Sequence, residues 1–160
     1  MVDLATITAA IGAATAGVGL IDKIGDQVSR FLTKREAPVM PVEHRAKIER
    51  DGDAIVQKHH GVEYQRITAS QLQQKLPEAD LRHIKVLERS MENHYAVWAS
   101  VYPQLALAVD PIAKAKTEQQ LKGIVVDMKG DLVGILDFLL QAGLNLDDHY
   151  RNIRDVVARA

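Results

Sequence analysis

The chain has 160 residues, a common size for one folded domain, and 47% of them are hydrophobic. The 20 basic and 21 acidic residues nearly cancel, and they form no clustered basic stripe, so the composition argues against nucleic-acid binding. The lack of cysteine excludes disulfides, thiolate metal sites and a cysteine nucleophile. The first residues do not have the basic start of a secretory signal, so we expect a cytoplasmic protein.

The first predicted element is a long amphipathic helix over residues 4–34. Apolar residues recur there at alternating spacings of three and four, which is the period of a helix with one buried face. Asp3 is placed to cap the N-terminus, and the pair Lys34–Arg35 suits the negative C-terminal end. Six positions of this stripe are our candidate interaction residues: Ile7, Ile11, Val18, Ile21, Val28 and Leu32.

The first part of this helix, residues 4–21, is an uncharged run. Ala9, Ala13 and Gly17 repeat within it at four-residue spacing, which lets two helix backbones approach closely. The run is at the lower edge of the length that spans a bilayer, and its threonines and glycines dilute its hydrophobicity. The pattern predicts a core helix of a bundle, a seam for self-association, or a helix that inserts into membranes.

The same region is similar to part of a known class of helical bundles. Residues 2–34, with their acidic cap and a run rich in Ala, Gly and Ile, resemble the first helix of the HeLo-type and necroptosis-executioner bundles. The resemblance implies membrane contact through residues 4–21. It does not extend to the rest of the chain.

A linker and a small sheet are predicted after this helix. Pro38 and Pro41 disfavour a helix, so we expect residues 37–44 to be a linker. Residues 45–68 are predicted to be a small antiparallel meander, and Asp51-Gly52 is typical of a type I′ turn within it.

The second loop of this meander is expected at His60-Gly61. A two-residue loop there places Lys58 opposite Glu63, a favourable cross-strand pair. The competing interpretation is a helix over Glu43–Arg50 followed by a single hairpin.

The rest of the chain is predicted to be helical, over residues 69–102, 111–141 and 146–158. We expect Pro103 to end the first of these segments, because proline removes a backbone donor and clashes with the preceding turn. Gly143 is placed to end the second.

The predicted fold is therefore mainly α, a single helical domain over residues 1–160. It is an antiparallel bundle of about four long helices with a small β-hairpin or meander insert around residues 45–68.

Few polar residues on these helices suggest chemistry. His94 falls in an apolar stripe, where a histidine is expected to be a hydrogen-bonded core or interface residue. Asp127 and Asp131 are one turn apart and are predicted to lie on a solvated face, while Gly130 and Gly134 mark the close approach of a neighbouring helix. We assign no catalytic residue, no metal ligand and no cofactor.

Three functions are consistent with this sequence. The leading hypothesis is a non-catalytic module that binds a protein partner or a second copy of itself through apolar helix faces. The first alternative is a membrane-acting effector that inserts residues 4–21 into lipid, which would make the protein membrane-associated. The second alternative is an enzyme with a site between helices, built from His94, Tyr95, Asp127 and Asp131.

Overall fold

The computed structural model of the protein describes residues 2–35 and 40–160. Within this part the chain is mainly helical, with five α-helices, one 3-10 turn and one three-stranded sheet. The helices are α1 Leu4–Thr33, α2 Ala69–Lys75, α3 Glu78–Leu107, α4 Pro111–Gln141 and α5 Asp148–Ala158. The 3-10 turn is Val42–His44, and the strands are β1 Lys47–Asp51, β2 Ala54–His59 and β3 Val62–Thr68.

The helices differ from the expected bundle in number and length, and the predicted helical segment 69–102 is divided between α2 and α3. In the described chain three helices, α1, α3 and α4, have 30 or 31 residues, whereas α5 has 11, so three rather than four are long. Of the predicted linker 37–44, residues 37–39 lie outside the described residues. The remaining part contains the 3-10 turn, and β1 follows at Lys47–Asp51, so the competing prediction of a helix over Glu43–Arg50 is wrong.

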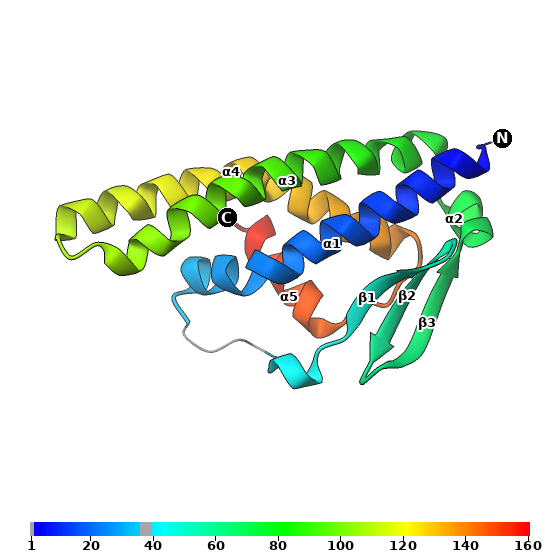
Figure 1. Cartoon of the computed structure of the whole chain (residues 1–160), viewed down its shortest axis with the longest axis horizontal. Coiled ribbons are helices and arrows are strands. Elements are labelled where there is room, and N and C mark those ends of the chain that lie inside the picture. Colours follow the sequence, from blue (N-terminus) through cyan, green and yellow to red (C-terminus); the bar gives the residue numbers. More distant parts are fainter. Residues whose placement is uncertain (1, 36–39) are drawn as a thin grey trace.

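The long helices do not all alternate in direction (Figure 1). α3 and α4 are antiparallel, since Leu87 approaches Gly134 while His94, further along α3, bonds to Asp131, further back on α4. α1 and α3 run the same way, because contacts between them advance together, with Lys23 beside Tyr95 and then Phe31 beside Trp98. The sheet and α2 carry the chain back to the starting end of α1, which makes this parallel pairing possible.

α3 continues through Pro103 to Leu107, so the expectation that it ends before this proline is wrong. Proline lacks the N–H that would bond to the carbonyl of Ala99 one turn earlier. Packing around this turn compensates, because Tyr102 stacks on the buried Trp98 and Leu105 packs against the core. The extra turn makes the end of the α3–α4 hairpin project beyond α1 and α5 (Figure 1).

The sheet is the predicted meander, with strand order β1-β2-β3 and antiparallel pairing throughout. The type I′ prediction for Asp51-Gly52 is wrong. The loop residues are Gly52 and Asp53, and only Gly52 has a positive φ, whereas a type I′ turn needs two. His60 and Gly61 both have positive φ and form the two-residue loop of the second hairpin.

The predicted register across this second loop is confirmed, with Lys58 opposite Glu63. Their side chains do not pair with each other, however. Lys58 forms its ion pair with Glu49 of β1, at 3.2 Å, and Glu63 pairs with Arg66 of its own strand.

Two glutamines fasten the sheet to the loop between α4 and α5. Gln57 and Gln65 lie opposite each other on β2 and β3. The Gln57 amide donates to the carbonyl of Asn145 at 2.6 Å and accepts from the N–H of Asp147 at 3.2 Å. The Gln65 amide donates to the carbonyl of Gly143 at 2.7 Å and accepts from the N–H of Asn145 at 2.6 Å. Together they bind this loop as a neighbouring strand would.

Gly143 ends α4 as predicted. Its φ of +99° is left-handed, and the N–H groups of Gly143 and Leu144 bond to the carbonyls of Leu140 and Leu139. This pair of bonds is a Schellman motif, which satisfies carbonyls at the helix end. Asp147 precedes α5, but its carboxylate accepts from the N–H of Ala46 instead of capping the helix.

The buried hydrophobic residues form one contiguous core. It draws on every helix and strand of the described chain except the 3-10 turn, and α1 crosses it from end to end. Gly17 lets this helix approach α4, where a Cβ would lie 2.9 Å from the Ile135 side chain. Of the two glycines predicted to mark a close approach on α4, Gly134 does so against Leu87, whereas Gly130 has open space beside it.

Candidate functional site

The six candidate interaction residues on α1 face the interior of the protein. Ile7, Ile11, Val18, Ile21 and Val28 are at most 3% exposed, and Leu32 is partly buried against the same core. Helices α3, α4 and α5 and the sheet cover this stripe. Interaction through these side chains would therefore require that the folded protein open.

α1 is nevertheless long and apolar enough to cross a membrane by length and composition. Of its apolar 18-residue window, 44% is buried, and Ala5, Ala9 and Ala16 are exposed on its outward face. Ala5, Ala9, Gly12 and Ala16 line a shallow groove on this face, with Arg50 of β1 at its edge.

His94 belongs to a small polar cluster between α3 and α4. Its Nδ1 and the Ser90 hydroxyl both lie 2.7 Å from the same carboxylate oxygen of Asp131. Asp131 is 9% exposed, so the prediction that it lies on a solvated face is wrong, while Asp127 is exposed as expected. The prediction failed because the buried face of α4 is broader than the spacing of its apolar residues suggests, so this face also includes Asp131.

This cluster does not have the arrangement of a nucleophilic triad. In a triad the serine bonds to the histidine and the histidine bonds to the carboxylate, so that the imidazole can accept the serine proton. Here Ser90 and His94 both bond to Asp131 directly. Tyr95 contacts Lys23 of α1 instead, so the four residues of the enzyme hypothesis do not converge. The cluster links two helices.

A second polar cluster joins α1 to α5. The buried Tyr150 donates its hydroxyl to the Asp22 carboxylate at 2.7 Å. Burial raises the pKa of Asp22 to about 6, and the hydrogen bond from Tyr150 and the charge of Arg45 offset part of this rise. Asp22 is exposed along one edge, where water stabilises the charged form and weakens the shift. Burial and the Asp22 charge raise the pKa of Tyr150.

Arg45 and His149 extend this cluster. The Arg45 guanidinium donates to Asp26 at 2.7 Å and to the carbonyl of Met40 at 2.8 Å, and its Nη2 has no hydrogen-bond partner in the described chain. His149 is 7% exposed, and burial together with the nearby Arg45 charge lowers its pKa to about 4. His149 is therefore neutral at physiological pH.

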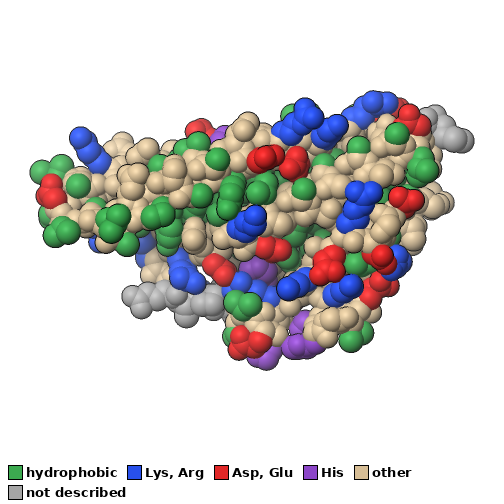
Figure 2. Space-filling model, viewed as in Figure 1, with side chains coloured by type: hydrophobic (Ala, Val, Ile, Leu, Met, Phe, Trp, Pro, Cys, Tyr) green, Lys and Arg blue, Asp and Glu red, His purple; other side chains and the backbone are tan. Residues whose placement is uncertain are grey.

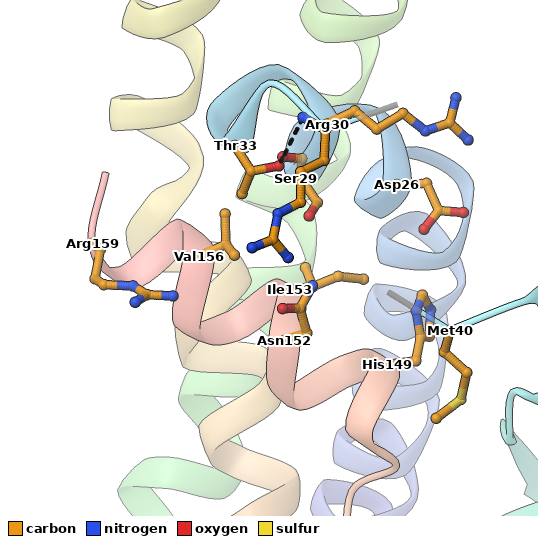
Figure 3. Close-up of a pocket in the computed structure, with 11 residues that line it drawn as sticks. Asp26, Ser29, Arg30, Thr33, Met40, His149, Asn152, Ile153, Val156 and Arg159 are labelled. Carbon is orange, nitrogen blue, oxygen red and sulfur yellow. Dashed lines mark hydrogen bonds between the residues drawn. The ribbon is translucent and has the colours of Figure 1, made fainter. Parts of the chain in front are cut away.

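A small polar cavity of about 100 Å³ lies between the C-terminal part of α1 and the length of α5 (Figure 3). The side chain of Arg30 enters it from α1, and Ser29, Thr33 and Asn152 also line it. Arg159 borders it at the end of α5. Both helices end here, so the two arginines complement the negative ends of two helix dipoles. This interaction with the helix ends accounts for both arginines, so no anionic ligand is needed to explain their presence.

The most unusual surface is the end of the α3–α4 hairpin. Leu107, Val109 and Ile112, which we call the hairpin tip, are 77%, 96% and 72% exposed. These are the three highest values among the exposed large hydrophobic side chains of the described residues, and they lie within six positions of one another. Figure 2 shows hydrophobic side chains gathered at this projecting end. Exposed hydrophobic residues are usually scattered singly over a soluble domain, so three within one short segment set this end apart.

A basic groove lies just behind the hairpin tip, between the end of α1 and the two helices of the hairpin. It has a volume of about 500 Å³. Its apolar and aromatic lining includes Phe31, Tyr102 and Leu105, and its cationic lining includes Lys34 and Lys114. Arg30, Arg35 and Glu118 also line it, and the Lys34 amine lies 4.8 Å from the centre of the Phe31 ring.

Sequence reasoning missed both surfaces, although the sequence contains a signal for the first. Residues 105–109 are an unbroken apolar run that leads into the loop, where polar residues are normally expected. The prediction that α3 ends at Pro103 removed this run from the helix and concealed its position at the end of a hairpin.

Comparison with known proteins gives no assignment. No family model matches the chain, and neither the curated proteins nor the solved structures include a significant match to it. In the described residues, no group of three or more histidine, aspartate or glutamate side chains is placed to hold a metal ion.

Proposed function

We propose that the protein is a non-catalytic docking module that binds an anionic membrane surface through its hairpin tip. The exposure of Leu107, Val109 and Ile112 at one projecting end carries this proposal. Water-exposed aliphatic side chains gain free energy when they are buried, about 1.5–3 kcal/mol each for complete burial. A bilayer interface offers that burial to a convex end without requiring a matching pocket.

The hairpin tip replaces the α1 stripe as the proposed contact. The stripe from Ile7 to Val28 is already buried by the folded chain, so its apolar surface is not free to bind. Insertion of residues 4–21 would expose the core that these residues now fill. Docking through the tip requires no such rearrangement, because the fold already presents these side chains to solvent.

Charge favours a lipid surface over a protein partner. Lys114 and Lys116 follow Ile112 within about one turn of α4, and both are exposed. A basic residue close to an anionic leaflet contributes roughly 1 kcal/mol of attraction. Asp110 is the acidic residue of the loop, and its carboxylate accepts a hydrogen bond from the N–H of Ile112 as the cap of α4. Its charge limits the tip to shallow insertion.

Vesicle flotation with the full chain tests this proposal. The protein is mixed with phosphatidylcholine vesicles that contain or lack phosphatidylserine, and the floated fraction is measured. We expect binding to the phosphatidylserine vesicles and a drop of at least tenfold in affinity for Leu107→Gln/Val109→Gln/Ile112→Gln. All three positions are outside the core, so the variant should keep the melting temperature of the wild type.

The matched control is Val62→Gln/Val86→Gln/Val126→Gln, which removes three valines of 58–67% exposure scattered over β3, α3 and α4. We expect it to bind vesicles as the wild type does. Equal binding by the tip variant and the wild type would contradict the proposal. So would a wild-type dimer that the tip variant converts to a monomer without vesicle binding by either protein, since the tip would then bind a second copy.

A further inference from the structure

The basic groove lies at the depth that lipid headgroups would occupy if the hairpin tip were inserted. Tyr102 is five residues from Leu107 along α3, and Lys114 and Glu118 are two and six residues from Ile112 along α4. At 1.5 Å per helical residue, the groove wall extends from about 3 to about 9 Å behind the tip. The apolar face of an interfacial helix is buried about 5–10 Å into the headgroup and acyl boundary, which is a similar depth.

The lining of the groove suits a phosphate-bearing amphiphile. Lys34, Arg35 and Lys114 supply cations, and Glu118 is the acidic residue among the lining residues. Phe31, Tyr102 and Leu105 supply an apolar surface beside them. Tyr102 is only partly buried, and its ring stacks on Trp98, so it lies at the boundary between the core and the groove. An aromatic ring with a polar end is favoured at this level of a bilayer.

We infer that the basic groove binds the phosphate headgroup of an anionic phospholipid, with the cations on the phosphate and the apolar lining against its glycerol and upper acyl chain. This inference rests on the proposed function, since the hairpin tip brings the groove to the membrane. The groove adds selectivity. The tip supplies apolar burial on any bilayer, whereas the groove distinguishes a headgroup with excess negative charge.

A pair of charge-matched variants separates groove binding from diffuse attraction. Lys34→Gln/Lys114→Gln removes two cations from the groove, and Lys116→Gln/Lys122→Gln removes two exposed cations of α4 that do not line it. We expect affinity for phosphatidylserine vesicles to fall about fivefold in the control, which is the loss of the diffuse attraction of Lys116. In the groove variant we expect a fall of at least thirtyfold. Binding to pure phosphatidylcholine vesicles should be the same in both variants.

Soluble ligands identify the source of the phosphate. Dihexanoyl phosphatidylserine below its micellar concentration and inorganic phosphate are each titrated into the full chain, with amide shifts recorded by NMR. We expect the short-chain lipid to shift the signals of Phe31, Lys34 and Tyr102 in the wild type but not in the groove variant. Inorganic phosphate should bind the same residues at least tenfold more weakly.

Several results would overturn the inference. Equal losses in the two charge-matched variants would show diffuse attraction only, and equal affinity for inorganic phosphate would show a free-phosphate site. Different results would contradict the proposed function, so the two proposals can be tested independently. If the tip variant floats like the wild type while the groove variant is impaired, the tip proposal is wrong and the groove remains. If the tip variant loses binding and the groove variant keeps it, the groove inference is wrong.

Discussion

The side chain of Ile135 on α4 lies directly against the backbone of Gly17 on α1. A Cβ at position 17 would be 2.9, 3.2 and 3.4 Å from three carbons of that isoleucine. Ile135 is fully buried and is branched at Cβ, so it cannot turn its end away as a longer flexible chain could. Glycine at this position therefore sets the distance between the two helices.

Gly17→Ala should destabilise the protein, whereas Gly19→Ala should stabilise it. Alanine gains about 1 kcal/mol over glycine in a helix, but overpacking a core costs about 1–3 kcal/mol. Position 19 has open space beside it, so only the gain applies there. We expect Gly17→Ala to lower the free energy of unfolding by about 1 kcal/mol and Gly19→Ala to raise it by a similar amount. Urea denaturation measures both, and stabilisation by both substitutions would contradict the close approach.

Gln57→Met should detach the sheet from the α4–α5 loop. The substitution keeps the size of the side chain but leaves the carbonyl of Asn145 and the N–H of Asp147 without partners in a buried region. Each unsatisfied group costs about 1–3 kcal/mol, so we expect a loss of about 2–4 kcal/mol in the free energy of unfolding. Gln119→Met, at an exposed position of α4, is the control and should change this free energy by less than about 0.5 kcal/mol. Amide hydrogen exchange should accelerate at residues 143–147 in Gln57→Met alone.

Tyr150→Phe should weaken the contact between α1 and α5. The substitution removes the hydroxyl that donates to Asp22 at 2.7 Å, and a hydrogen bond to a charged group contributes about 1.5–3 kcal/mol when buried. Because Asp22 is partly solvated, we expect a loss of about 1–2 kcal/mol. A cycle with Asp22→Asn measures the coupling. Additive effects of the two substitutions would show that the hydroxyl and the carboxylate act independently.

Acid should destabilise the protein through His149. Its pKa is about 4 in the folded protein, below the ordinary value of 6.5, so below pH 6.5 the unfolded chain binds a proton that the folded protein does not. The contribution of His149 to the free energy of unfolding is therefore fully present above pH 6.5. It decreases as the pH drops towards 4, by about 3 kcal/mol at most. The pKa of Asp22 is raised, so its contribution has the opposite sign over an overlapping range.

Comparison of two variants isolates the histidine effect, because Asp22 is present in both. His149→Gln should remove the acid destabilisation between pH 6.5 and 4 and leave the opposite contribution of Asp22, so its melting temperature should fall less on acidification than that of the wild type. His83→Gln, at an exposed position of α3, should leave the dependence of the wild type unchanged. If His149→Gln retains the full acid sensitivity of the wild type, the sensitivity has another origin.

The sequence predicted the elements whose cause is local. The spacing of apolar residues and the Asp3 cap place α1, and Asp110 and Gly143 define α4, because caps and helical periodicity act within a few residues. The His60-Gly61 loop and the Lys58–Glu63 register follow in the same way.

What the sequence did not predict depends on contacts between distant segments. The burial of Asp131 requires Ser90 and His94 from another helix, and the role of Gln57 requires a loop about ninety residues later. The continuation of α3 through Pro103 depends on packing around Tyr102 that no local preference encodes. The hairpin tip was missed for this reason, since its exposure is a property of the arrangement of the helices.

The central position of α1 has a consequence for work with fragments. Removing residues 1–34 would take the middle out of the core, so the remaining chain should collapse into a loosely packed state that binds hydrophobic dyes. The excised segment would expose its apolar face to water and would therefore partition into detergent micelles or lipid. Liposome binding by such a peptide would reflect only its apolar composition, so the proposed docking through the hairpin tip has to be tested with the intact chain.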